Sequence, residues 1–496
     1  MYYPTKKDFI RLAKKGNLIP VYRELLADTE TPVSAFLRMD KGDYSFLLES
    51  VEGKEKIARY SFLGGTPALI FKSKGNEVQV ITPRSKKRFI SQSPLADLKK
   101  ILSDFRAIPL EGLPRFCGGF VGYIGYDMVG FFENISPHRK DDLKTPDCMF
   151  MLADTIVIFD HINHKIKVVA NAHIKEKVSK DRAYSEALRK IDAIIGKLNR
   201  KLKIAKKKDT ENKAQNKNIK ISSNLSKAKF KENVLRAKKY IKDGEIIQVV
   251  LSQRFKTKVV GNDFDIYRAL RSLNPSPYMY YLKFKGLSIV GASPEVFVRC
   301  EDGRVELRPI AGTRRRGKDA AEDSLLEKEL LASEKERAEH IMLVDLGRND
   351  LGRVCEYGSV KVEELMSVER YSHVMHIVSD ITGRLKKGRD AFDLIEAAFP
   401  AGTVSGAPKI RAMKIISEME DNARGPYAGC IVYFGFSGNL DSCITIRTIL
   451  IKDKEAYIQA GAGIVSDSIP EAEYDETVNK AKAMFKAVEL AGRGMR

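Results

Sequence analysis

The stretch that decides the fold is IQAGAGIVSDSIPEAEYDETVNKAK, residues 458–482. Its Gly461-Ala462-Gly463 predicts a tight loop whose backbone N–H groups could face an anion. Pro470 suits the first turn of a helix, and the helix then places Val478, Ala481, Phe485 and Val488 on one apolar face. Glu473, Glu476 and Lys480 follow at i, i+3 and i+7, which puts them on one polar face. The stretch therefore predicts a packed helix that carries a charged cluster beside a candidate anion site.

A second carboxylate pair lies upstream, in EKERAEHIMLVDLGRND at 334–350. Glu336 and Glu339 are three residues apart on a helical face. Four carboxylates that converge from two helices repel one another unless a cation lies between them, and Mg²⁺ prefers oxygen ligands. Because a single E-x-x-E is usually a solvated surface pair, the residues alone leave both interpretations open.

Other residues near these segments suit an anion or proton transfer. Arg447 lies in the run 443–451, CITIRTILI, which predicts one strand with a charge that needs a partner such as a substrate carboxylate. The run 402–406, GTVSG, predicts a second tight loop. The pairs His373/His376 and His161/His164 have zinc-ligand spacing but no third ligand, so an acid/base or structural role is expected for His376.

Composition narrows the classes of protein. The 496 residues are 43% hydrophobic and 30% charged, as in a soluble globular enzyme. No apolar run is long enough for a transmembrane helix, and the first ten residues lack the apolar region of a secretory signal. Six scattered cysteines without a C-x-x-C pair fit a reducing compartment, and we expect a cytoplasmic protein.

Nearly half of the net charge of +21 lies in one segment. Twelve basic and two acidic residues lie between Lys197 and Lys229. We predict a solvated basic linker or loop insertion at 197–228, and the alternative is a nucleic-acid-binding tail. The absence of interleaved aromatic residues in this segment argues against nucleic acid.

The predicted linker divides the chain into an N-terminal α/β domain, 1–196, and a catalytic domain, 229–496. In the first, 44–49 and 150–159 predict strands, the latter leading through a hairpin into 166–172, and 181–198 predicts a helix. In the second, Phe230, Val234, Ala237 and Ile241 predict an amphipathic helix that ends near Gly244, followed by many strands.

The order of six motifs is recognisable: RPIAGTRRRG (308–317), EKERAEHIMLVDLGRNDLG (334–352), HVMHIVSDITGRL (373–385), FPAGTVSGAPKIRAM (399–413), GPYAGCIVYFGF (425–436) and the stretch 458–482. This order resembles the chorismate-utilising enzymes, and most of all component I of anthranilate synthase. Upstream, LLESVEGKEKIARYSFLG (47–64) resembles the N-terminal region of the same subunits.

The resemblance implies an α+β fold, with a large antiparallel β-sandwich flanked by helices and an N-terminal domain packed against it. It implies Mg²⁺ ligation by Glu339 and Glu476, with Glu336 and Glu473 contacting metal-bound water. The implied chorismate contacts are Gly312, Thr313, Tyr427, Arg447 and the backbone of Gly461, Ala462 and Gly463. His376, Thr403 and Lys480 match further active-site positions.

The implied reaction adds ammonia to chorismate and releases anthranilate and pyruvate, the first committed step of tryptophan biosynthesis. The ammonia would come from glutamine through a separate amidotransferase subunit, component II, because none of the cysteines lies in a G-x-C-x-G turn. The resemblance also implies feedback inhibition by tryptophan at Glu49 and Ser50, together with Asn274, Pro277, Tyr278 and Met279.

Two positions separate this activity from its relatives. Aminodeoxychorismate synthases typically carry a lysine where this chain has Ala311, and isochorismate and salicylate synthases typically carry a lysine base where it has Gln248. The nearest alternative is component I of aminodeoxychorismate synthase. A non-catalytic ligand sensor on the same fold would be expected to lack the four glutamates, and all four are present.

Overall fold

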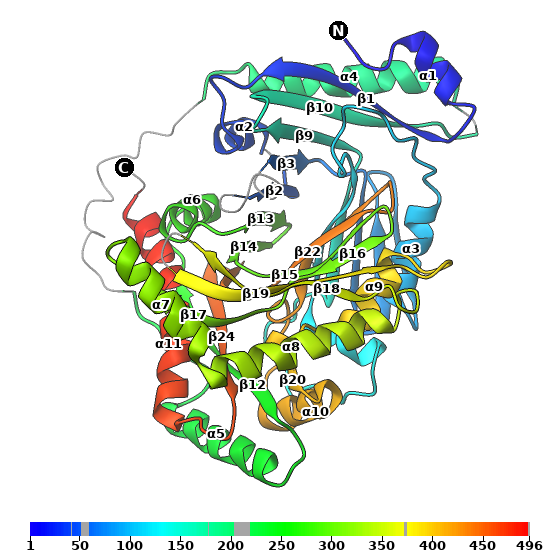
Figure 1. Ribbon diagram of the computed structural model, residues 1–496. Helices are drawn as coiled ribbons and strands as arrows, with labels where there is room; N and C mark the ends of the chain where they lie inside the picture. Colours follow the sequence, from blue (N-terminus) through cyan, green and yellow to red (C-terminus); the bar gives the residue numbers. More distant parts are fainter. Residues whose placement is uncertain (41, 51–58, 177, 203–218, 372–373, 495–496) are drawn as a thin grey trace.

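The computed structural model describes residues 1–40, 42–50, 59–176, 178–202, 219–371 and 374–494. Within them, two twelve-stranded antiparallel sheets form the centre of the molecule (Figure 1). The first sheet has the order β1 (Leu18–Leu26), β10 (Lys165–His173), β9 (Thr155–Asp160), β3 (Tyr60–Gly65), β2 (Ser45–Glu49), β13 (Tyr278–Phe284), β14 (Leu287–Ser293), β23 (Thr448–Lys452), β24 (Glu455–Ile464), β12 (Gln248–Lys258) and β11 (Ser222–Ser223), with β20 (Gly406–Ala407) beside β12.

The second sheet completes the sandwich. Its order is β17 (Ile310–Arg315), β19 (Val374–Arg384), β16 (Arg304–Leu307), β15 (Val296–Glu301), β22 (Leu440–Ile444), β21 (Cys430–Gly435), β7 (Gly119–Ile124), β8 (Cys148–Ala153), β4 (Leu69–Lys74), β5 (Glu77–Ile81) and β6 (Lys86–Ile90), with β18 (Lys361–Arg370) beside β19.

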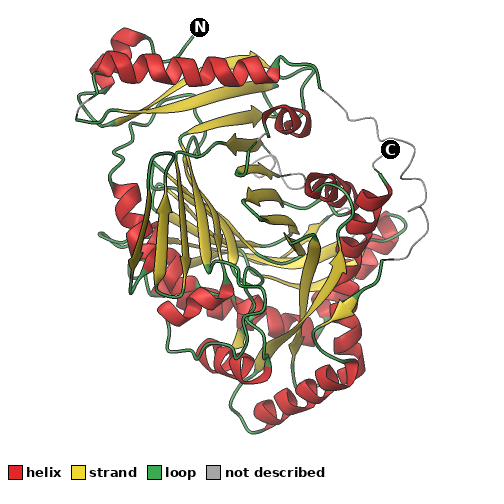
Figure 2. Ribbon diagram, turned by 180° about the vertical axis from the view of Figure 1, so that it is seen from behind, coloured by secondary structure: helices red, strands yellow, loops and turns green. Residues whose placement is uncertain are grey.

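Strand periodicity explains the layers. In β9, Ile156 and Ile158 face a core shared with the second sheet, whereas Val157 and Phe159 face a core on the outside of the first. Helices cover the outer faces (Figure 2). Those packed on the first sheet are α1 (Lys6–Leu12), α2 (Pro32–Met39), α4 (Lys180–Leu198), α6 (Asp263–Leu273) and α11 (Pro470–Arg493). The fold is the expected helix-flanked β-sandwich.

The remaining helices pack either around the second sheet or against β12, near the end of the first sheet. They are α3 (Pro94–Ser103), α5 (Lys227–Lys242), α7 (Ala320–Ala332), α8 (Glu334–Gly352), α9 (Ala391–Ala398) and α10 (Lys409–Met419), with 3₁₀ turns at η1 (Tyr126–Phe131) and η3 (Gly402–Val404). Helix α8 runs across β17 and β19, and α11 lies along β24 and against α5 (Figure 1). The two helices with predicted carboxylate pairs therefore lie on different sheets, α8 on β17 and β19 of the second sheet and α11 on β24 of the first.

Two predicted strands are wrong, for one physical reason. The run 150–159 forms β8 and β9, and the run 443–451 forms β22 and β23. In each case the chain leaves the second sheet and enters the first. The breaks fall at Asp154 and at 445–447, where Arg447 has a φ of +48° that no regular strand allows. The predicted helix 181–198 and the hairpin of β9 with β10 are confirmed.

Strands from both halves of the chain pair with each other. In the first sheet β2 pairs with β13, and in the second β7 pairs with β21. The predicted domain boundaries at 196 and 229 stay a prediction, although the pairing ties the halves together. Part of the predicted linker, 203–218, lies outside the described residues, and β11 within 197–228 pairs with β12.

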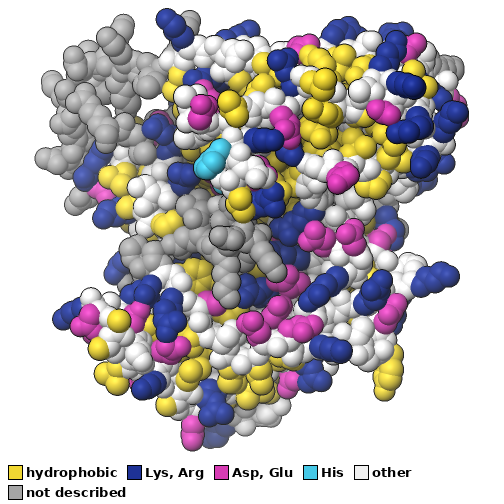
Figure 3. Space-filling view, turned by 45° about the horizontal axis from the view of Figure 1, so that its top comes forward, with side chains coloured by type: hydrophobic (Ala, Val, Ile, Leu, Met, Phe, Trp, Pro, Cys, Tyr) yellow, Lys and Arg dark blue, Asp and Glu magenta, His cyan; other side chains and the backbone are white. Residues whose placement is uncertain are grey.

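The distribution of charge on one face is visible in Figure 3. Lysine and arginine side chains are scattered there among acidic ones rather than gathered in one basic patch. Among the described residues, no helix combines the length and the apolar character that a membrane span needs.

Candidate active site

The centre of the candidate site lies where two neighbouring chain segments cross between the sheets. Glu295 lies between β14 and β15, and Arg447 lies between β22 and β23. Because β14 pairs with β23 and β15 with β22, the two crossings are adjacent. The backbone fixes both: Ile444 N donates to Glu295 O over 3.1 Å, and Ala292 N donates to Arg447 O over 3.2 Å.

Arg447 carries a positive charge without a matching anion. Among the described residues, none forms a hydrogen bond or an ion pair with its guanidinium. Burial lowers the pKa of Arg447, and the nearby Glu295 carboxylate only partly opposes this shift. A half-buried, unpaired guanidinium is suited to bidentate binding of a carboxylate. The structure thus places at the crossing a cation that is suited to bind a carboxylate.

Glu295 is a candidate that the sequence reasoning missed. Its burial raises its pKa to about 7, although the Thr403 hydroxyl, Arg447 and Lys480 favour the charged form. A buried carboxyl group of this kind can carry a proton near neutral pH and deliver it. The only local signal is one carboxylate in SPEVFV between two apolar strands. Thr403, a predicted site residue, lies against it in η3.

His376 projects from β19 on the same side. Its Nδ1 lies 3.0 Å from the carbonyl oxygen of Gly312 and 3.0 Å from Oγ1 of Thr313. Since a carbonyl can only accept, Nδ1 carries the proton in the neutral ring and Nε2 is left as an acceptor. Burial lowers the pKa of His376, and the Arg447 charge lowers it further. The Gly312 carbonyl and the Glu369 carboxylate raise this pKa and so oppose part of the shift. The imidazole is therefore neutral near pH 7.

Gly312 and Thr313 form a bulge in β17. The pairing of β17 with β19 shifts register between Ala311 and Thr313, and Gly312 has a φ of +65°. A Cβ at Gly312 would lie 3.1 Å from Oε2 of Glu336 on α8. The glycine thus lets the strand backbone approach the carboxylate helix, which connects the predicted substrate-binding and metal-binding residues.

The prediction of a tight loop at 461–463 is wrong. Gly461, Ala462 and Gly463 lie within β24, opposite Ser252, Leu251 and Val250 of β12. Their small size serves close packing instead. A Cβ at Gly463 would lie 2.5 Å from Nε2 of Gln248, and one at Gly461 would lie 2.7 Å from the hydroxyl oxygen of Tyr427. The two glycines leave space for Gln248 and Tyr427 beside the strand.

The four predicted carboxylates lie on two helices that face each other. Glu336 and Glu339 are on α8, and Glu473 and Glu476 are on α11. Burial raises the pKa of Glu339, and the carboxylates of Glu336 and Glu476 raise it further. A hydrogen bond of 3.1 Å from Gln248 lowers this pKa and opposes part of the shift. The pKa of Glu473 is raised as well, by burial and by the charge of Glu476. The mutual repulsion shows that the helices bring these groups together.

This carboxylate cluster fits a divalent cation. Oε2 of Glu473 is buried and has no hydrogen-bond partner within the described residues. In that part of the chain, no three or more His, Cys, Asp or Glu side chains are arranged to hold a metal without other ligands. Mg²⁺ is commonly held by one or two carboxylates plus water and substrate oxygens, so the opposing pair Glu339 and Glu476 is suited to it.

Cationic side chains partly balance the cluster. Arg314 Nη1 lies 3.3 Å from Glu336 Oε1, and Lys480 Nζ lies 2.7 Å from Glu476 Oε1. Lys480 Nζ also donates to the carbonyl oxygen of Gly461 over 3.0 Å. The predicted active-site lysine therefore joins α11 to β24, between the carboxylates and the Gly461 backbone.

The predicted effector residues gather at a second place, on the β2–β13 pair. Glu49 and Met279 are direct cross-strand partners. The Glu49 carboxylate accepts hydrogen bonds from Tyr267 and Arg271 of α6. Asn274 caps that helix, and its buried Nδ2 has no hydrogen-bond partner among the described residues. Ser50 and Pro277 adjoin the ends of β2 and β13.

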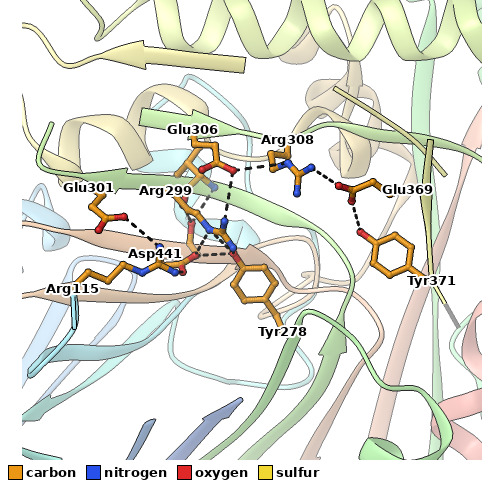
Figure 4. A network of polar contacts seen from close by, with 11 residues as sticks. Arg115, Tyr278, Arg299, Glu301, Glu306, Arg308, Glu369, Tyr371 and Asp441 are labelled. Atoms are coloured by element: carbon orange, nitrogen blue, oxygen red, sulfur yellow. Dashed lines mark hydrogen bonds and ion pairs between the residues drawn. The ribbon is translucent and has the colours of Figure 1, made fainter. Parts of the chain in front are cut away.

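A polar network leads from Tyr278, one of the predicted effector residues, toward the candidate active site around His376 (Figure 4). The Tyr278 hydroxyl donates to Asp441 Oδ1 over 2.7 Å and accepts from Arg299 Nε over 2.9 Å. Arg299 reaches Glu306 at 3.6 Å, and Arg308 lies between Glu306 and Glu369. The network ends near β19, which carries His376.

The other histidines and the cysteines contribute no comparable site. His161 Nε2 lies 2.7 Å from Ser61 Oγ, and His373 lies outside the described residues. All six cysteines are free thiols. Burial raises the pKa of each of them, so none resembles an activated nucleophile.

Comparison with known proteins identifies the family and the fold. Residues 46–486 match the family model described as chorismate binding enzyme. The chain is 50% identical to anthranilate synthase component 1 of Acetivibrio thermocellus, over 99% of each chain, and 49% identical to that of Aquifex aeolicus, over 97% of each. The crystal structure of anthranilate synthase component I from Streptococcus pneumoniae TIGR4 matches with a TM-score of 0.77 at 37% identity, covering 93% of this chain and 99% of that one.

The chain belongs to the family of chorismate binding enzymes. Within that family, the expected resemblance to component I of anthranilate synthase is confirmed along the whole chain.

Proposed function

We propose that this protein is the aminase subunit of anthranilate synthase. It converts chorismate and ammonia to anthranilate, pyruvate and water. The proposal is supported by whole-chain similarity to proteins named anthranilate synthase component 1 and by the groups gathered at the crossing. We further propose a cytoplasmic location, which the free cysteines support.

The observation that carries the proposal is the unpaired guanidinium of Arg447 beside Glu295 and His376. Chorismate presents two carboxylates, one on the ring and one on the enolpyruvyl group. Arg447 would bind the enolpyruvyl carboxylate bidentately. The hydroxyl of Tyr427 adjoins Gly461 and would line the same pocket. Thus one end of the substrate is fixed by this chain's own groups.

The other end of the substrate would face the carboxylate cluster. Glu339 and Glu476 would hold Mg²⁺, with Glu336 and Glu473 contacting its water ligands. When bound, the metal supplies positive charge to the ring carboxylate and stabilises charge that develops there. Gln248 orients Glu339 through its 3.1 Å hydrogen bond, and Lys480 orients Glu476 through its ion pair.

Proton transfer to the departing ring hydroxyl is the task that fits Glu295. As ammonia adds beside the carboxylate-bearing carbon, that hydroxyl leaves as water and needs one proton. His376 is neutral and its Nδ1 proton is directed at Gly312, so it is a poor donor at Nε2. Glu295, with a pKa of about 7, still holds its proton in a large fraction of molecules. His376 and Thr403 would orient the hydroxyl.

The nucleophile is ammonia because the positions that would supply another are not basic. Ala311, where a lysine would attack the ring, is a buried alanine in β17. Gln248, where a lysine would activate water, is an amide that donates to Glu339. The nearest alternative remains component I of aminodeoxychorismate synthase, which shares the amination step.

Two further parts complete the proposal. Glutamine would supply ammonia through a component II amidotransferase, because this chain's thiols have raised pKa values. Tryptophan would bind at the β2–β13 place, where the unsatisfied amide of Asn274 and the strand ends adjoin. Binding there would favour an arrangement that disfavours chorismate.

Substitution of Arg447 tests the proposed site. Arg447→Gln should keep the fold but weaken chorismate binding, measured by calorimetry with Mg²⁺ present, by at least about tenfold. Arg447→Lys should recover only part of the loss, since an ammonium lacks the planar fork. Arg304→Gln, an exposed arginine on β16, is the matched control. Wild-type chorismate affinity in Arg447→Gln would exclude this carboxylate contact.

A further inference from the structure

The side of His376 toward β18 is occupied by a second layer of polar groups. Glu369 of β18 is the direct cross-strand partner of His376 on β19. Because directly opposed residues of an antiparallel pair project to the same face, the Glu369 carboxylate lies next to the imidazole. Its charge favours the protonated ring, which agrees with this placement.

The Glu369 carboxylate is held at both oxygens. Arg308 Nη2 donates to Oε1 over 2.7 Å, and the Tyr371 hydroxyl donates to Oε2 over 2.9 Å (Figure 4). The Arg308 and Glu369 side chains are only 14% and 19% exposed, so water screens their ion pair weakly. The carboxylate therefore has a fixed place and orientation.

Tyr371 extends this fixed group to the imidazole. Its ring meets the His376 ring edge to face, with centroids 5.8 Å apart and planes inclined by 61°. Its backbone is anchored as well: Tyr371 N donates to Val374 O over 2.8 Å, and Arg316 Nη1 donates to Tyr371 O over 2.7 Å. A tyrosine held at both its hydroxyl and its backbone restricts rotation of the neighbouring ring.

We propose that Glu369, held by Arg308 and Tyr371, is a positioning residue that fixes the imidazole of His376 in the active site. The group keeps Nδ1 directed at Gly312 and Nε2 directed into the site. Glu369 touches no substrate in this arrangement and acts only through His376. The proposal rests on the proposed function for the role of His376, and it adds Glu369 and Tyr371, which lie outside the sequence motifs.

The charges around His376 define the expected effect on its titration. Arg447 faces it from the β22–β23 crossing and Glu369 from β18, while the neutral Tyr371 ring, the Gly312 carbonyl and the Thr313 hydroxyl complete its surroundings. Of the two charged groups, only Glu369 favours imidazolium. Its removal should lower the pKa of His376, since burial and Arg447 then act unopposed by a carboxylate.

Glu369→Gln is the decisive variant, and Glu364→Gln, an exposed carboxylate on the same strand, is its control. For the ammonia-dependent reaction we expect Glu369→Gln to lower kcat roughly 10- to 100-fold with less than about a threefold change in the KM for chorismate. Tyr371→Phe keeps the ring but loses the hydrogen bond, so a smaller decrease of kcat is expected. Glu369→Asp should restore part of the lost kcat.

A second measurement needs no turnover. In NMR spectra of protein with labelled histidine, the His376 resonance, assigned with His376→Gln, should titrate at lower pH in Glu369→Gln and at wild-type pH in Glu364→Gln. A wild type that makes no anthranilate would overturn the proposed function, whereas this titration would still test the positioning. Unchanged kcat with an unchanged His376 titration would overturn the inference. So would a loss of kcat that accompanies a lowered melting temperature while the titration stays unchanged.

Discussion

Glu295 and Arg447 lie on adjacent chain crossings between the two sheets, and the charge of Arg447 acts on the Glu295 carboxyl group. At a crossing the chain is no longer in a regular strand, so each of these residues can direct its side chain into the space where the sheets separate. The arrangement places the Arg447 cation beside a buried acid, and the first prediction concerns that acid.

Glu295→Gln should lower kcat by at least about 100-fold, because an amide cannot deliver the proton that the leaving hydroxyl needs. In the wild type, kcat should fall as pH rises through about 7, where Glu295 loses its proton. Stability should change in the same direction: the pKa of Glu295 in the folded protein lies above the ordinary glutamate value of 4.5, so stability should decline between about 4.5 and 7 as pH rises. A Glu295→Gln enzyme with more than half the wild-type kcat would contradict the role.

Glu339→Gln should separate metal binding from folding. Without metal, the substitution removes repulsion from Glu336 and Glu476, so the melting temperature should stay equal or rise. With Mg²⁺, the wild type should gain stability, about 2.7 kcal/mol when the metal is 100-fold above its Kd, and Glu339→Gln should lose that gain. Glu334→Gln, exposed in the first turn of α8, is the control. An equal Mg²⁺-induced shift in Glu339→Gln would argue against the ligand assignment.

Glutamine should be inert with this chain alone. Burial raises the pKa of Cys117 and of Cys148 to about 12, which leaves almost no thiolate near neutral pH. We expect ammonium to support turnover, and glutamine to do so only after a component II subunit is added. Release of glutamate from glutamine by the purified chain would contradict the need for a separate subunit.

Ser50→Phe should relieve tryptophan inhibition without loss of catalysis. Ser50 follows β2, next to Glu49, which pairs with Met279, and Ser50 is not among the groups that we place at the Arg447 crossing. The coupling between tryptophan and chorismate should be about 1–3 kcal/mol and reciprocal in the wild type. Inhibition curves at fixed chorismate, with Ser50→Ala as the control, measure it. Undiminished tryptophan sensitivity in Ser50→Phe, or its absence in the wild type, would refute the regulatory site.

The buried ion pair of Arg424 with Glu420, next to the candidate site, should contribute strongly to the free energy of unfolding. Arg424 is fully buried, donates to Glu420 and to the carbonyl oxygens of Val250 and Val404, and lies under the ring of Tyr427. Arg424→Leu leaves a buried, unpaired carboxylate and should cost about 3–5 kcal/mol of unfolding free energy in urea. The double variant with Glu420→Leu should recover much of it. A loss below about 1 kcal/mol for the single variant would be inconsistent with this burial.

The spacing of apolar and acidic residues along the sequence predicted the helices and the two carboxylate pairs, because a helix places residues i and i+3 on one face regardless of context. It failed at Arg447 and at 461–463. An apolar run does not reveal where a chain changes sheets, and the small residues Gly461, Ala462 and Gly463 become a strand only through pairing with β12. The sequence did not predict a role for Glu295 because its raised pKa comes from burial, and the segments around it, at Thr403 and Arg447, are more than 100 residues away in the chain.

The most direct test of the central claim is to identify the product. Purified protein is incubated with chorismate, ¹⁵N-labelled ammonium and Mg²⁺, and the products are separated and quantified by mass spectrometry. We predict anthranilate that carries ¹⁵N and an equimolar amount of pyruvate. Accumulation of aminodeoxychorismate or isochorismate without pyruvate would contradict the account.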